Sequence, residues 1–233
     1  MPRRLSAAIF RPGRRSWLRG ATAAAMAAGM LQLRAALAAG SLPPGVAQIK
    51  GDVRINGKPA ERGQRVAQGD VIITGSNGEL VFVTERDAFL VRANSRIEFG
   101  SAAARSAVTV LRVLTGALLS VFESGTRREI RTTTATIGIR GTGIYVETEK
   151  QRTYACTCYG EAVLTPVDDP AAAETVRTKR HDQPRYIYGK GMPQMTKMME
   201  AAPVINHTDA ELQMLEALVG RKVPFEPGTY LTP

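Results

Sequence analysis

The stretch QGDVIITGSNGELVFV, residues 68–83, contains the pattern that decides the fold. It holds a first short run rich in Val, Ile and Thr, Val71–Thr74, and most of a second, Glu79–Thr84, which ends one residue beyond it. A turn pair precedes each run, Gly69-Asp70 and Asn77-Gly78. Residues of the first kind favour strands, whereas Gly, Asn and Asp suit tight turns. The stretch therefore predicts two short strands separated by turns.

The same pattern extends from Val46 to Pro166, with Gly, Asn or Asp about every ten residues. Apolar and polar residues alternate in Ala88–Arg92 and Ser95–Phe99, as expected for strands with one wet face. Short strands at this spacing predict an all-β fold, either a sandwich or a solenoid-like stack of turns.

The order of several motifs in this region resembles the FecR domain, the periplasmic domain named after the regulator of ferric-citrate uptake. The matching pieces are GDVRINGKPA (51–60), QGDVIITGSNGELVFV (68–83), RANSRIEF (92–99), LRVLTGALLSVF (111–122), TATIGIRGTGIYVE (134–147) and CYGEAVL (158–164). The most recognisable triplet is Arg140-Gly141-Thr142, and Gly160 also fits the family. We interpret these four residues as structural, the triplet forming a tight corner with a buried arginine and a threonine hydroxyl.

The resemblance implies a non-catalytic binding or sensing domain. FecR-type regulators also carry an anti-sigma region and one transmembrane helix before this domain, and neither is expected in the segment before Gly51. We therefore expect the domain's partner to be a periplasmic or envelope protein or a glycan, and a sigma-factor signalling role stays an open alternative.

Residues 1–38 have the features of an export signal. Arg14 and Arg15 open the run RRSWLRG, a mildly apolar stretch follows, and Ala36-Leu37-Ala38 is a small-residue cleavage site. The pattern resembles a twin-arginine signal peptide, which implies export of an already folded protein to the periplasm. An ordinary Sec signal with a chance arginine pair is the alternative.

The composition changes once this segment is set aside. Its seven arginines and lack of acidic residues mean that its removal lowers the formal net charge from +10 to +3. A protein with so small a net positive charge is not expected to bind nucleic acid. The rest of the chain has no apolar stretch of 18 residues, so we expect a soluble mature protein without a membrane anchor. We divide it into a β domain, 39–167, and a C-terminal extension, 168–233.

The two cysteines and the two histidines of the chain form a candidate metal site. Cys156 and Cys158 lie two apart in TYACTCYG, and His181 and His207 follow. Side chains two apart in a strand share a face, so both sulfurs and both imidazoles could surround one zinc or copper ion. Two alternatives remain open: free cysteines packed as small hydrophobes, or a strained disulfide. His207 also suits a solvent-facing turn.

The C-terminal extension has three further features. Residues 168–178 suggest an exposed loop, and Arg185–Tyr188 a short strand. A capping box, Thr208-Asp209-Ala210-Glu211, and a leucine stripe predict a helix near 209–219. Four methionines at helical spacing form either an apolar face or a copper(I) site: Met192, Met195, Met198 and Met199.

Enzymatic motifs are missing from the sequence, which has no serine elbow, phosphate loop or HExxH. We expect a non-catalytic FecR-type sensing or binding protein, linked to envelope or metal regulation. A Cys/His metalloprotein is the first alternative, and a structural module that binds glycan or protein is the second.

Overall fold

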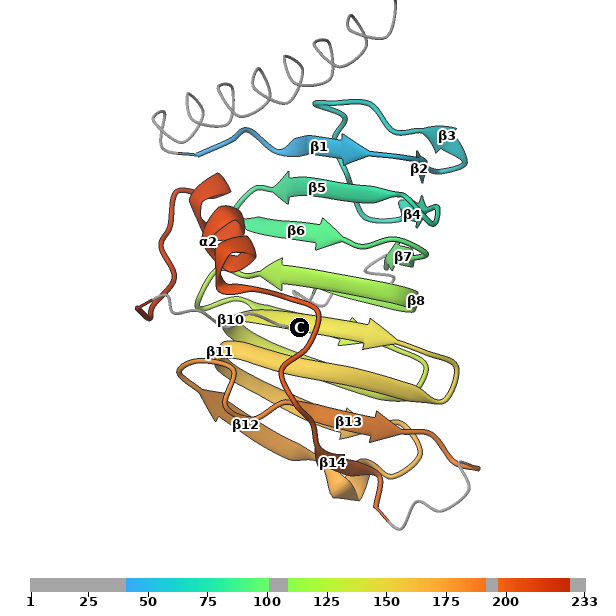
Figure 1. Cartoon of the computed structure of the whole chain (residues 1–233), viewed down its shortest axis with the longest axis vertical. Helices are drawn as coiled ribbons and strands as arrows, with labels where there is room; N and C mark the ends of the chain where they lie inside the picture. The colour runs from blue at the N-terminus through green and yellow to red at the C-terminus, as the bar shows by residue number, and fades with distance from the viewer. Residues whose placement is uncertain (1–40, 101–108, 192–196, 227–233) are drawn as a thin grey trace, which may run out of the picture. The chain divides into compact units, whose positions relative to one another are not determined.

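The computed structural model describes residues 41–100, 109–191 and 197–226. These residues form a mostly β fold with one short helix near the C-terminus (Figure 1), as the sequence predicts. The strands are β1 Gly45–Lys50, β2 Val53–Ile55, β3 Lys58–Pro59, β4 Val71–Thr74, β5 Glu79–Thr84, β6 Asp87–Val91, β7 Arg96–Phe99, β8 Thr109–Val121, β9 Arg127–Arg131, β10 Ala135–Thr148, β11 Arg152–Pro166, β12 Glu174–Thr178, β13 Arg185–Tyr188 and β14 Met199–Ala201.

Three long strands, β8, β10 and β11, connect two sets of shorter ones. The first half of β8 pairs with β7 and β9, and its second half pairs with β6 and β10. In the same way β10 changes partner from β9 to β8, and β11 from β13 to β12. The described strands thus form one continuous 14-stranded sheet that bends back on itself, with a shared core between its two parts.

Glycines lie where the long strands change partners. Gly116 in β8 and Gly141 in β10 have φ angles of 79° and 53°, and Gly160 in β11 has 91°. A Cβ on Gly116 would lie 2.5 Å from Cα of Ser95, and one on Gly141 would lie 2.5 Å from Cα of Ser124. Only glycine therefore fits these two bends without moving the backbone.

The family-like triplet lies at the second of these bends. The pairing register of β10 with β11 shifts between Arg140 and Gly143, so the triplet forms a bulge. The prediction that Arg140 is buried is wrong, because its side chain is exposed. An outward-facing position lets the guanidinium keep its water, which burial without a partner would remove. The side chain of Thr142 lies outside the described residues.

The core is built from the inward faces of both parts of the sheet. Strands β2 and β4 alternate buried and exposed residues, whereas every residue of β6 is buried. Four phenylalanines meet in the core, with ring centroids 4.7–5.7 Å apart: Phe82, Phe89, Phe99 and Phe122. Aromatic contacts of this kind add to the apolar area that the fold buries.

The C-terminal extension adds strands to the same sheet. β12 pairs with β11, β13 with β11, and β14 with β13. The strand predicted at Arg185–Tyr188 is confirmed. The loop expected over 168–178 is wrong in part, because a 3₁₀ turn at Pro170–Ala172 leads into β12, in which Val176 and Thr178 are buried.

The predicted helix is α2, Asp209–Leu218, and its capping box is present: Thr208 accepts from the Glu211 amide while the Glu211 carboxylate accepts from the Thr208 amide. It packs on β6 and β8 and buries Leu212, Leu215 and Leu218. Each such leucine contributes about 1.5–3 kcal/mol on burial. The segment that joins α2 to the sheet passes across β10 and β11 (Figure 1).

Two expectations lie wholly or partly outside the described residues. The signal segment with Arg14 and Arg15 is one, and Met192 and Met195 belong to the other. Met199 begins a strand, so the methionines do not continue along a helix there. Among the described residues, no helix has the length and apolar character needed to cross a membrane.

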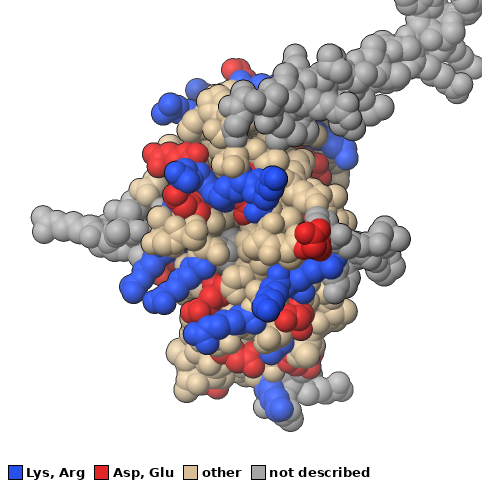
Figure 2. Space-filling model, turned by 90° about the vertical axis from the view of Figure 1, so that its left-hand side faces the viewer, with Lys and Arg blue, Asp and Glu red and all other residues tan. Residues whose placement is uncertain are grey.

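Acidic and basic side chains are interspersed on the face shown in Figure 2. Several arginines form ion pairs, among them Arg128 with Asp87 at 2.8 Å and Arg177 with Glu161 at 2.7 Å. Such pairing balances part of the positive charge that the arginines carry.

Candidate metal centre

Strand β11 supplies both cysteines. Cys156 and Cys158 are two apart in the half of β11 that pairs with β10, and both are fully buried free thiols. The Cys158 thiol lies 3.5 Å from the carbonyl oxygen of Cys156 and donates to it. The two sulfurs therefore face the same side of the strand, as the alternation of side chains requires.

His181 follows β12 and folds back over β11. Its φ angle is 48°, in the left-handed region that histidine adopts more readily than β-branched residues. Its amide donates to the carbonyl of Cys158 at 3.0 Å, which fixes the backbone beside the cysteines. The ring Nδ1 then lies 3.5 Å from Sγ of Cys156.

His207 reaches the cysteines from the segment that precedes α2. Its ring stacks on Tyr145 of β10, with centroids 4.6 Å apart and an interplanar angle of 21°. Only 1% of the residue is exposed, so the solvent-facing alternative is wrong. The stacking and the burial position Nε2 of His207 3.0 Å from Nδ1 of His181.

The structure thus brings all four predicted ligands together. One donor atom from each of Cys156, Cys158, His181 and His207 lies within 4.8 Å of every other, and all four residues are buried. Ligand atoms around a tetrahedral zinc ion, bound at about 2.0–2.3 Å, are separated by about 3.3–3.8 Å. The group needs only small side-chain adjustments to reach that geometry.

Hydrogen bonds outside the group determine which ring nitrogens face inward. His207 Nδ1 lies 2.6 Å from the carbonyl of Ile205, and His181 Nε2 lies 3.0 Å from Oδ1 of Asp209. A carbonyl and a carboxylate accept, so each of these nitrogens carries a proton. In the neutral rings the two remaining nitrogens both present lone pairs, and they face each other. A proton or a cation between them relieves that repulsion.

Asp209 and Phe225 enclose the His181 side of the group. Asp209 is buried, and its second oxygen accepts from Arg180 at 2.7 Å. Phe225 lies against the ring of His181, with centroids 6.1 Å apart, and Arg180 lies over the Phe225 ring. A histidine that donates to a carboxylate while its other nitrogen faces a group of thiols is the usual arrangement of a metal ligand.

The pKa values of Cys156, Cys158 and His181 are shifted in different directions. Burial alone would raise the pKa of the Cys156 thiol, but hydrogen bonds from Cys158, His181 and His207 outweigh it and lower that pKa well below its usual range. Burial also opposes the charge of His181, yet its bonds with Cys156 and Asp209 raise its pKa. Burial and the neighbouring Cys156 thiolate raise the pKa of Cys158. The protein thus favours a thiolate at Cys156, the form that binds metals.

Cys156 contacts His181, and His181 contacts Asp209, which is also how the nucleophile, base and orienting acid of some hydrolases are arranged. A nucleophile must be reachable by substrate, and Cys156 has no exposed surface. Its sulfur faces the other three members of the group instead. The arrangement is therefore better suited to holding an ion than to attacking a substrate.

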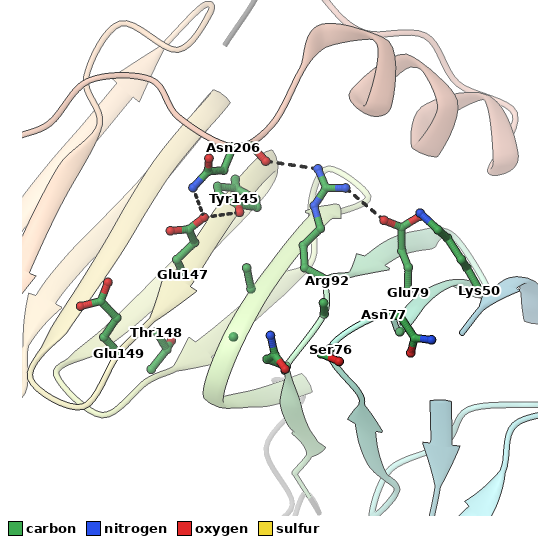
Figure 3. A pocket seen from close by; sticks show the side chains of 15 residues that line it. Lys50, Ser76, Asn77, Glu79, Arg92, Tyr145, Glu147, Thr148, Glu149 and Asn206 are labelled. Carbon is green, nitrogen blue, oxygen red and sulfur yellow. Dashed lines mark hydrogen bonds and ion pairs between the residues drawn. The ribbon is translucent and has the colours of Figure 1, made fainter. Parts of the chain in front are cut away.

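A pocket of about 620 Å³ shares Tyr145 and Asn206 with the surroundings of this group, and many of the residues that line it are polar or charged (Figure 3). The hydroxyl of Tyr145 and the side-chain amide of Asn206 both donate to Oε1 of Glu147, at 2.5 and 2.7 Å. Arg92 donates to the carbonyl of Asn206 and forms ion pairs with Glu79 and Glu211. Tyr145 is thus shared, because its ring stacks on His207 while its hydroxyl faces the pocket.

The structural residues singled out in the sequence lie elsewhere. Arg140 and Gly160 line a second hollow of about 600 Å³ with Arg177, Lys179 and Asp182. Sequence reasoning missed Tyr145, Asp209 and Phe225 as neighbours of the histidines. Asp209 was visible only as part of the capping box, and the sequence contains no pattern that places it beside His181.

Comparisons with known proteins give one weak likeness. No family model matches the sequence, and no curated protein matches it. Among solved structures, two of a "putative anti-sigma factor" from Parabacteroides distasonis are similar in backbone arrangement. For the first, the TM-score is 0.46 and the sequence identity 8%, and the match covers 62% of this chain and 74% of the matched chain. For the second, the TM-score is 0.45 and the sequence identity 8%, and the match covers 61% of this chain and 70% of the matched chain.

Proposed function

We propose that this chain is a non-catalytic metal-binding protein in which Cys156, Cys158, His181 and His207 hold one zinc ion. The observation that carries the proposal is the pair of facing nitrogens, His181 Nδ1 and His207 Nε2, 3.0 Å apart with their outer nitrogens committed to acceptors. A bound cation turns this repulsive contact into two ligand bonds, and the two buried sulfurs complete a four-coordinate set.

Charge favours zinc over copper(I). Two thiolates and two neutral imidazoles carry a charge of about −2, which a divalent ion cancels and a monovalent ion leaves half uncompensated. An uncompensated charge is costly in a fully buried place. The neighbouring ion pair of Asp209 with Arg180 is already balanced.

Four protein ligands leave no open position on the ion. Zinc sites of this kind are structural, whereas catalytic sites keep one position for water or substrate. The ligands come from β11, from the turn after β12 and from the segment before α2. The ion would therefore join three parts of the chain that are distant in sequence.

We assign this metalloprotein to the FecR-type binding or sensing class, acting in the periplasm. The ordered motifs between residues 51 and 164 and the twin-arginine-type segment support this assignment. That export route implies folding, and often cofactor insertion, before the membrane is crossed. The pocket beside Tyr145 is the place where an envelope protein or glycan would be recognised.

The metal content of the natively exported mature protein tests the proposal. Protein purified without chelator and under reducing conditions is expected to contain about one zinc per chain by elemental analysis. The Cys156→Ser, Cys158→Ser double variant should contain almost none. Thr157→Val is a matched control, because it alters the buried residue between the cysteines and removes no ligand. Wild-type protein that neither carries zinc nor takes it up would refute the proposal.

A further inference from the structure

The segment Asn206–Asp209 connects the proposed metal centre to the pocket. Asn206 contributes to the pocket wall, His207 is a ligand, Thr208 caps α2 and Asp209 is the first residue of the helix. Four consecutive residues therefore contact the pocket, the centre and the helix. A change in the position of His207 must move the residue on either side of it.

Asp209 provides the second link. One of its oxygens accepts from His181 at 3.0 Å and the other from Arg180 at 2.7 Å. The bond to His181 directs the other ring nitrogen of that ligand, Nδ1, toward His207 and Cys156. The first turn of α2 thus holds a ligand that lies 28 residues earlier in the chain.

On the pocket side, the same segment is tied to two strands. The Asn206 side chain donates to Glu147 at 2.7 Å, and its carbonyl accepts from Arg92 at 3.2 Å (Figure 3). Arg92 also bonds Glu211 of α2 at 2.6 Å. This wall of the pocket is therefore built from the residues that flank the metal ligand.

The far end of α2 is held differently. Glu216 accepts from Tyr159 and from Arg221, and the carbonyl of Leu218 accepts from the amide of Leu42. These contacts involve none of the four ligands. Loss of the ion is thus expected to loosen the start of the helix and to leave its end docked.

We infer that metal occupancy controls the pocket wall, and that Asp209 is the positioning residue that couples the two sites. This inference rests on the proposed function. With the ion bound, His181 and His207 are fixed, and Asn206 stays against Glu147 and Arg92. Without it, the two facing nitrogens separate, the segment Asn206–Asp209 moves away and the pocket opens. Binding of a partner at the pocket and binding of the ion then favour each other by the same factor.

Hydrogen exchange of the reduced mature protein, with zinc added or with chelator, tests the inference. We expect zinc to slow exchange about tenfold or more across 204–210, and to change it little at 215–219. Asp209→Asn should weaken zinc affinity about 10- to 100-fold, the usual effect of changing a residue that orients a ligand. At saturating zinc this variant should also retain less protection across 204–210.

Gln213→Glu is the matched control, because it changes the charge of α2 by one unit at an exposed position of the same helix, away from the segment Asn206–Asp209. It should bind zinc as the wild type does. If Asp209→Asn fails to fold, Arg180→Met, which removes the ion pair of Arg180 with Asp209, replaces it and should weaken zinc affinity in the same direction. Unchanged zinc affinity in the variant, or protection across 204–210 that does not depend on zinc, would overturn the inference while leaving the metal site intact. Failure of the wild type to bind zinc would instead refute the proposed function.

Discussion

Nε2 of His207 lies 3.0 Å from Nδ1 of His181, and each ring donates a proton to an oxygen on its outer side. Two neutral imidazoles would repel each other in this contact, because both facing nitrogens present lone pairs. Tyr145 and the Ile205 carbonyl hold one ring in place, and Asp209 holds the other. The contact is therefore stable with a proton or a cation between the rings, and the buried sulfurs of Cys156 and Cys158 beside it are ligands for a cation.

Removal of the ion should destabilise the fold measurably. Zinc at 100 times its dissociation constant contributes about 2.7 kcal/mol. For a chain of this size each kcal/mol corresponds to about 2–4 °C. We expect chelator to lower the Tm of the reduced protein by about 5–10 °C in differential scanning calorimetry, and zinc to restore it. The Cys156→Ser, Cys158→Ser variant should not respond to either addition, and an equal response would contradict the assignment of ligands.

Gly116→Ala should destabilise the β fold strongly. The new Cβ would lie 2.5 Å from Cα of Ser95 at a φ of 79°, so the backbone must shift. Gly57→Ala is the control, because its φ is 78° and a Cβ there meets nothing within 4 Å. The control isolates the cost of positive φ, about 1–2 kcal/mol. Urea unfolding should show a larger loss for Gly116→Ala, and equal losses would mean that the bend tolerates a side chain.

Leu215→Ala should weaken the docking of α2 without affecting metal content. Leu215 is fully buried against the sheet, and truncation of such a leucine costs about 2–5 kcal/mol. Denaturant unfolding checks the loss, and elemental analysis checks that zinc remains near one per chain. A variant that loses zinc at temperatures where it stays folded would show that the helix, and not the ligand set, holds the ion.

Two substitutions of Tyr145 should distinguish the effects of its two contacts. Tyr145→Phe keeps the ring that stacks on His207 and removes only the hydroxyl that donates to Glu147. We expect a loss of about 0.5–1.5 kcal/mol and unchanged zinc affinity. Tyr145→Ala removes the stack as well and should cost about 3–5 kcal/mol and weaken zinc binding. Equal zinc affinities in the two variants, measured by competition with a chelator, would argue against a role for the stack.

The sequence predicted the strands and the helix wherever pattern and turn residues agreed. β4, β5 and α2 follow directly from β-branched runs, glycine turns and a capping box. β12 was missed because Pro170 and the alanines after it indicate a loop, whereas pairing with β11 orders the residues that follow. Tertiary pairing of this kind is not visible in local pattern.

The four proposed ligands could be chosen by residue type, but their surroundings could not. Two cysteines on one strand face and two histidines are few enough to be grouped on chemical grounds. The contact of Asp209 with His181 depends on the turn after β12 meeting the first residue of α2, which only the folded chain brings about. The exposed Arg140 shows the opposite error, in which a motif position was assumed to be buried.

X-ray absorption at the zinc edge of protein purified without chelator tests the central claim most directly, because it reports the atoms bound to the ion. We expect two sulfur neighbours at about 2.3 Å and two nitrogen neighbours at about 2.0–2.1 Å. The Cys156→Ser, Cys158→Ser variant should lose the sulfur signal. A wild-type ion surrounded only by oxygen and nitrogen, or protein that holds no zinc after reconstitution, would contradict the metal centre described above.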